Sequence, residues 1–180
     1  MKKTLLLATS IAVLAGIWTV IVVNVGAFGP VPFVLWPTFI GWAAYFYLGA
    51  TGEGSRNAIV QLFTGAILSG IFIAIYSALK LSDPLSIWLG VFVVIIAWPL
   101  TALSGVSKYW AAVPAGFCGA AAWFGVSAMG KDPLITTIAT LIPLLCGVIL
   151  GWLSNIIVRK VDAGQPAAGD GSPEQVVAGG

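Results

Sequence analysis

One eight-residue stretch occurs twice in the chain. The first copy reads Phe39-Ile-Gly41-Trp-Ala43-Ala44-Tyr45-Phe46, and the second reads Phe117-Cys-Gly119-Ala-Ala121-Ala122-Trp123-Phe124. Five of the eight positions are identical, and a sixth keeps an aromatic residue. A short polar loop and another apolar segment follow each copy, so the stretch belongs to a larger repeated unit.

The segments on either side of the octamer also match. Ser69–Ala74 resembles Cys146–Gly151 at an offset of 77 residues, and Ala15–Trp18 resembles Leu89–Phe92 at an offset of 74. Membrane helices rich in Gly, Ala and Phe resemble one another by composition alone, so a single octamer would not establish a duplication. Three matches in the same order favour a duplicated unit of three segments.

Composition places the chain in a membrane. The 180 residues are 59% apolar and only 8% charged, whereas a soluble domain carries about 25% charged residues. The net charge of +2 arises from basic residues at segment ends, which indicates no nucleic-acid partner. Cys118 and Cys146 lie in apolar segments, where a buried thiol is favoured over a disulfide or a metal ligand.

Six apolar segments predict six transmembrane helices, at 5–23, 31–48, 58–79, 85–103, 109–127 and 133–158. The first could be a signal peptide, but its apolar run continues past any cleavage site, so we interpret it as a retained helix. A kink is expected near Trp36-Pro37, because proline interrupts a helix.

The predicted fold is all-α, with six transmembrane helices arranged as two inverted-topology three-helix repeats. We expect a transmembrane domain at 1–162, with repeats at about 5–80 and 84–158, and a disordered Gly/Ala/Pro-rich tail at 163–180. Each repeat crosses the membrane three times, so the two copies would have opposite orientations. Channels and transporters often use this plan, with the site between the repeats.

The basic residues predict that both termini are cytoplasmic. Six basic residues would lie inside and only Lys80 and Lys131 outside. The six are Lys2, Lys3, Arg56, Lys108, Arg159 and Lys160.

Small residues predict where helices pack, because close approach of small side chains stabilises helix contacts in lipid. The third segment carries Ala66, Gly70 and Ala74 at spacings of four, and the sixth carries Gly147 and Gly151 at the matching places. These ridges predict that the two helices meet near the axis that relates the repeats, as ordinary helix contacts.

The rings of the octamer suggest a path for solutes. Phe39 and Phe46 share a helix face, as do Phe117 and Phe124. If these faces point inward, four rings would narrow a path between the repeats, with Gly41 and Gly119 bringing the backbones close. The alternative is that the rings face lipid or fill the core.

Enzyme chemistry is not expected. The six segments contain no Asp, Glu, Lys, Arg or His, so they offer no acid–base, nucleophilic or metal-ligand group, and no cofactor is predicted. The Ser, Thr, Tyr, Asn and Gln side chains could bind a polar solute, or could bond to their own helix backbone.

The stretch from Ala15-Gly16-Ile17-Trp18 through Gly41–Phe46 to Leu68-Ser69-Gly70 resembles the YcdZ-like family of bacterial inner-membrane proteins, whose domain of unknown function is numbered 1097. The likeness covers most of residues 5–158 and implies a multi-helix protein of the bacterial inner membrane. It implies no substrate, catalytic residue or cofactor.

Two functions from different classes fit these features. The first is a channel or facilitator that passes a small uncharged or weakly polar solute passively. The second is a non-transporting accessory subunit. The expected partners are the lipid bilayer, a small neutral solute and further copies in a homo-oligomer.

Overall fold

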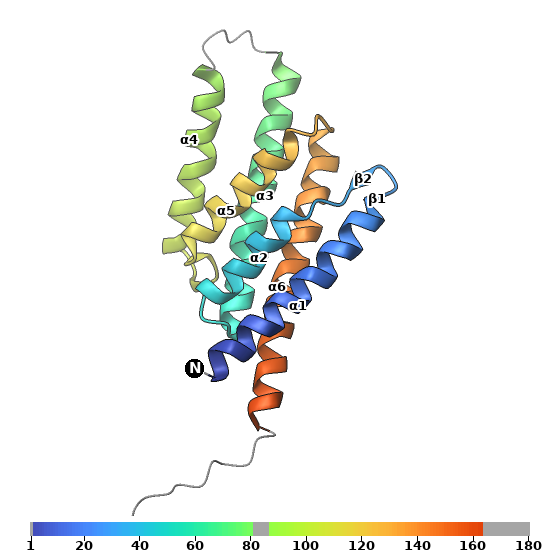
Figure 1. Cartoon of the computed structure of the whole chain (residues 1–180). Helices are drawn as coiled ribbons and strands as arrows, with labels where there is room; N and C mark the ends of the chain where they lie inside the picture. The colour runs from blue at the N-terminus through green and yellow to red at the C-terminus, as the bar shows by residue number, and fades with distance from the viewer. Residues whose placement is uncertain (1, 81–86, 164–180) are drawn as a thin grey trace, which may run out of the picture.

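The computed structural model describes residues 2–80 and 87–163 (Figure 1). The predicted tail at 163–180 and the start of the fourth segment therefore lie almost wholly outside the described residues. The elements, in chain order, are α1 (Lys2–Val25), β1 (Ala27–Phe28), β2 (Val31–Pro32), α2 (Trp36–Tyr47), α3 (Gly52–Leu79), α4 (Ile87–Ala102), η1 (Leu103–Gly105), η2 (Lys108–Trp110), α5 (Val113–Ser127) and α6 (Pro133–Ala163).

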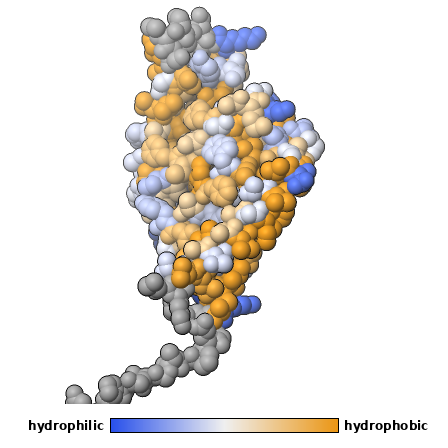
Figure 2. Space-filling model, viewed as in Figure 1, coloured by the Kyte–Doolittle hydropathy of each residue, from blue (hydrophilic) through white to orange (hydrophobic). Residues whose placement is uncertain are grey.

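Four of the described helices are long and apolar enough to cross a membrane: α1, α3, α4 continued by η1, and α6. The protein is therefore an all-α, multi-pass type of membrane protein, with one small β-hairpin. In Figure 2 apolar side chains cover much of the visible face, and the few strongly hydrophilic ones lie toward its edges.

The prediction of six full spans is wrong at two places. Helix α2 has 12 residues and α5 has 15, so they are about 18 and 23 Å long, short of a hydrocarbon core of about 30 Å. Pro37 and Pro114 stand in the first turn of these helices, where the missing N–H costs nothing. Pro37 therefore begins a helix rather than kinking one.

The two halves exchange their second helices. Helix α2 packs mainly on α6, and α5 packs mainly on α3. The first helices are peripheral in the same sense, since α1 lies on α6 and α4 lies on α3. In Figure 1, α2 and α5 cross the long helices α3 and α6 obliquely, and α1 and α4 lie at opposite sides.

Four glycines carry this exchanged packing. A β-carbon on Gly41 of α2 would overlap the carbonyl oxygen of Leu144 of α6, and one on Gly119 of α5 would overlap that of Leu62 of α3. The two glycines occupy the same position of the octamer. Because neither has a side chain, the helix backbones touch directly.

The third helices return the same contact. A β-carbon on Gly147 of α6 would overlap the carbonyl oxygen of Thr38, and one on Gly65 of α3 would overlap that of Gly116. Gly65, not Gly70, therefore has the environment of Gly147. The third helices correspond at an offset of 82 residues rather than 77, because backbone contacts align them and the short Ser-Gly match does not.

Large side chains fill the space between the helices. Tyr45 and Trp123, at the same octamer position, are both 1% exposed, and Leu62 and Leu144 are fully buried beside them. Because lipid is as apolar as these side chains, their close packing rather than escape from water stabilises the assembly.

Candidate functional site

The candidate site is the seam between α2 and α5, which lies on the outside of the bundle. One face of each helix is fixed against α6 or α3 by the glycine contacts. The opposite faces are exposed and consist mainly of small or aromatic residues. They are Trp36, Phe39, Ala43 and Tyr47 on α2, and Pro114, Phe117, Cys118, Ala121 and Gly125 on α5.

One end of this seam is hollow. A cavity of about 350 Å³ lies where the end of α2 passes the start of α5. Both halves of the chain line it, and no lining side chain is charged. The lining residues are Ile40, Ala43, Ala44, Tyr47, Pro114, Ala115 and Cys118. The volume is at the small end of the range typical of ligand sites.

The other end of the seam is filled. There the indole of Trp36 occupies the place that a β-carbon of Gly125 would take. In the octamer register Trp36 corresponds to Pro114, and Gly125 corresponds to Tyr47. The seam is therefore closed at one end by an indole and open at the other, where a compact proline stands in its place.

The structure separates the four predicted pore rings into two pairs. Phe39 and Phe117 are 40% and 45% exposed, on the outer face. Phe46 and Phe124 are half-buried and pack against the core. Each of the latter meets its neighbour edge-on, with ring centroids 5.2 Å apart for Tyr45–Phe46 and 5.5 Å apart for Trp123–Phe124. The predicted glycines, Gly41 and Gly119, lie in the helix contacts described above.

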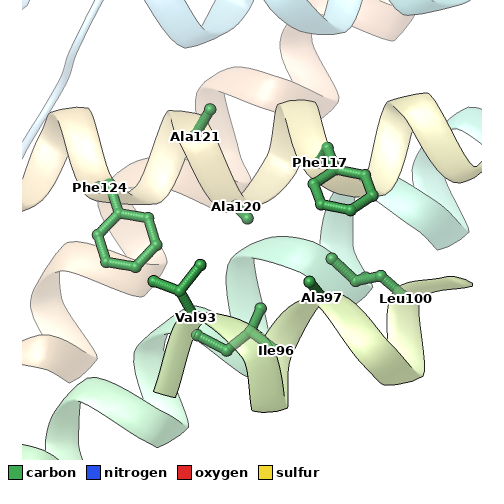
Figure 3. A pocket seen from close by; sticks show the side chains of 8 residues that line it. All are labelled: Val93, Ile96, Ala97, Leu100, Phe117, Ala120, Ala121 and Phe124. Atoms are coloured by element: carbon green, nitrogen blue, oxygen red, sulfur yellow. The ribbon is translucent and has the colours of Figure 1, made fainter. Parts of the chain in front are cut away.

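A second hollow, of about 200 Å³, separates α4 from α5 (Figure 3). The rings of Phe117 and Phe124 bound it on the α5 side, facing Val93 and Ile96 of α4. Ala120 lies between the two rings, at the octamer position that holds Trp42 in the other copy. The smaller side chain leaves this space unfilled.

The predicted packing ridges are only partly in contacts. Ala66 is fully buried, and Gly70 lies against Thr137 of α6 and the indole of Trp123. Gly147 and Gly151 pack on α2 instead of α3. Ala74 is exposed, because the last turns of α3 extend beyond the helices that bury its first half.

Most hydroxyl groups in the helices bond to their own backbone. The Oγ atoms of Ser69 and Thr140 donate to the carbonyls four residues earlier, at 2.9 and 2.8 Å, and Thr19 and Thr64 do the same. This is the usual alternative to binding a ligand for Ser and Thr in helices. These groups are therefore poor candidates for holding a solute.

Three indoles and one carboxamide tie the halves together. The Nε1 of Trp18 donates to Thr38, that of Trp110 to Thr64, and that of Trp123 to Thr137. Asn155 of α6 donates to the Tyr45 hydroxyl at 3.0 Å and to the Ala50 carbonyl at 3.1 Å, which fixes the turn after α2.

Two buried polar atoms have no hydrogen-bond partner. They are the Nε1 of Trp42 and the Oε1 of Gln61, whose amide nitrogen donates to the Trp110 carbonyl. Sequence reasoning did not single out Trp42. The available signal was that an indole replaces alanine at one position of an otherwise similar octamer. Both atoms remain able to bond to a small polar molecule.

The family described as a protein of unknown function, DUF1097, matches residues 8–159. The chain belongs to the DUF1097 family. This confirms the resemblance drawn from the octamer and its flanking segments. The match includes α2, α5 and both hollows, so the candidate site lies within the family region. No curated protein and no solved structure matches the chain significantly.

Proposed function

We propose that this DUF1097 protein is a membrane channel or facilitator that passes a small uncharged or weakly polar solute without coupling to an ion gradient. The observation that carries the proposal is the pair α2 and α5. They are short, begin at proline, occupy corresponding places in the two halves and enclose a hollow lined from both. Short, interrupted helices in corresponding positions are the best sequence-level pointer to a transport site.

The exchanged packing supports an inverted-topology repeat as the basis of this function. Each half contributes a long third helix that holds the other half's second helix. An arrangement of this kind allows the two halves to rock about the seam while each glycine contact stays intact. We place the solute path along the seam, with Phe46 and Phe124 beside it.

The chemistry of the seam limits the solute. The hollow has no charged side chain, and its polar groups are the hydroxyl of Tyr47 and the thiol of Cys118. An ion would have to shed water there without compensation. A small neutral molecule loses far less hydration, so solutes of the size of urea, short amides or glycerol fit this site best.

We propose a homo-oligomer in the bacterial inner membrane. The hollow is open on its outer side, because Tyr47 and Cys118 are exposed in the single chain, and a second copy would close it. A mass of two or more chains in mild detergent is expected by light scattering. A monomer in both detergent and native membranes would exclude this arrangement.

We further propose that both termini are cytoplasmic. The start of α1 and the end of α6 lie at the same end of the molecule (Figure 1). Basic residues favour the cytoplasmic side, and α3 and η2 contribute Arg56 and Lys108 to this end.

Solute flux tests the proposed function. In proteoliposomes, a stopped-flow shrink–swell assay should give faster entry of urea, acetamide or glycerol than in empty liposomes. A protonophore should leave the rate unchanged, because the helices offer no acid–base group to couple to protons. Flux that collapses with the protonophore would contradict the passive mechanism.

Variants of the two half-buried rings extend this assay. Phe46→Ala and Phe124→Ala should change the ratio of glycerol to urea entry more than they change the amount of folded protein, because each removes a ring beside the path. Phe39→Ala serves as the matched control, since that ring is exposed on the outer face.

The accessory-subunit function rests on a different observation. The space between the halves is filled by fully buried side chains such as Trp123, Tyr45 and Leu144, as expected of a rigid, non-conducting bundle. Absence of flux for every neutral solute, with folded protein in the liposomes, would favour this second function.

A further inference from the structure

Two cationic side chains converge on one aromatic ring at the edge of the apolar helices. The guanidinium carbon of Arg56, in the second turn of α3, lies 4.3 Å from the centre of the Tyr109 ring. The ammonium of Lys108, in the turn η2, lies 5.9 Å from the same centre. The two charges are therefore no more than about 10 Å apart.

This cluster carries a net positive charge. Glu53 lies 3.5 Å from Arg56, and both side chains are exposed, so this ion pair is weak. Within the described residues, Lys108 has no carboxylate within ion-pair distance. Two like charges beside one ring repel each other unless an anion lies between them.

The cluster lies where a phospholipid headgroup lies. Arg56 follows the start of a 28-residue apolar helix by one turn, and Lys108 lies in the connection between α4 and α5. Both positions mark the boundary of the apolar belt, where tyrosine is also enriched. Arginine presents a planar fork of N–H donors that matches phosphate oxygens, and lysine adds a point charge.

An apolar groove leads to the same connection. A shallow hollow of about 490 Å³ follows the outer face of α4, along Val94, Ala97, Trp98, Thr101 and Ala102. It ends where α4 passes into η1, and η1 packs against η2. A chain lying in this groove would therefore end close to Lys108.

We propose that Arg56, Lys108 and Tyr109 bind the phosphate of an anionic phospholipid, one acyl chain of which lies in the α4 groove. The basic side chains select the negative headgroup, and the ring holds them in place at the boundary. The site lies apart from the α2–α5 hollow, so it does not depend on the proposed solute path.

Native mass spectrometry of the full chain in neutral detergent tests this site. Titration with phosphatidylglycerol should reach half-saturation at a lower concentration than phosphatidylcholine with the same acyl chains. Lys108→Gln should raise the half-saturating concentration of phosphatidylglycerol about fivefold, the effect of one basic residue near an anionic surface. Arg56→Gln should do the same, whereas Arg56→Lys should keep most of the affinity.

Lys160→Gln is the matched control, because it removes an exposed cation at the same end of the molecule. It should change the half-saturating concentration less than twofold. Lys108 is the decisive variant, since its exposed side chain supports no other element and its removal should leave the melting temperature unchanged without added lipid. Equal losses for Lys108→Gln and Lys160→Gln would overturn the site.

Inorganic phosphate distinguishes a lipid from a soluble anion. Added at millimolar concentration, it should not displace phosphatidylglycerol, because it cannot use the α4 groove. Displacement by phosphate alone, or equal binding of phosphatidylcholine, would overturn the assignment to an anionic lipid.

Discussion

Replacing Gly65 or Gly147 with alanine should lower the free energy of unfolding by about 2–3 kcal/mol, the cost of overpacking a tight contact. At either position the new methyl group would overlap a backbone carbonyl oxygen of the facing helix. A backbone cannot rotate away as a side chain can, so the helices must separate. Thermal or denaturant unfolding in a single detergent would measure the change.

Gly16→Ala and Gly90→Ala are the matched controls. Both glycines lie within helices, and a β-carbon at either would meet no atom within 4 Å. Alanine is favoured over glycine in a helix by about 1 kcal/mol, so these variants should be neutral or slightly more stable. Unchanged stability in Gly65→Ala and Gly147→Ala would show that the helices do not touch in this way.

The comparison between Gly65 and Gly147 also tests the duplication. If the two halves pack equivalently, the two substitutions should destabilise the protein to a similar extent. Gly70→Ala should behave differently, because its nearest neighbours are side chains of Thr137 and Trp123, which can move. An equal effect at Gly70 would restore the sequence-based register of 77 residues.

Cys118→Trp should reduce solute flux at least about tenfold if the hollow lies on the path, since a close-fitting site admits little extra volume. The side chain is exposed and lines the hollow between α2 and α5, so the larger residue fills the hollow without entering the core. Flux in proteoliposomes, normalised to the amount of folded protein, is the measurement.

Ala121→Trp is the control for this change. Ala121 lies one turn along the exposed face of α5 and lines the other hollow, toward α4. The substitution adds the same bulk to the same helix and should leave flux unchanged. If both variants lost flux equally, the location of the path at the α2–α5 seam would be wrong.

The sequence identified the unit that repeats and the glycines that matter most in it. Gly41 and Gly119 share an octamer position, and the structure gives them matching backbone contacts. The register of the third helices could not be obtained this way. The match at Gly70 and Gly147 is two residues of a common type, whereas the contacts that align Gly65 with Gly147 are tertiary.

The lengths of α2 and α5 were also beyond the sequence pattern. Apolar residues continue from Val31 through Tyr47, so hydropathy does not separate the hairpin strand from the helix. Pro37 is compatible with either a kink or a helix start. Only the packing of α2 across α6 decides between them, and it turns the outer face of the helix away from the core.

The hollow itself could not be predicted from the repeat. A strict duplication would produce the same space at both ends of the seam. The indole of Trp36 fills one end, whereas Pro114 stands in its place at the other. This asymmetry depends on which side chains meet across the two helices, which is a property of the fold.

Reaction of Cys118 with a water-soluble thiol reagent is the most direct test of a solute path at the seam. The chain has two cysteines, so Cys146→Ser leaves Cys118 as the single thiol. In proteoliposomes of this variant, a small charged methanethiosulfonate should modify Cys118 and slow urea entry, and additional Cys118→Ala should abolish the sensitivity. Urea entry that is unchanged after complete modification of Cys118, confirmed by mass, would contradict a path through this hollow.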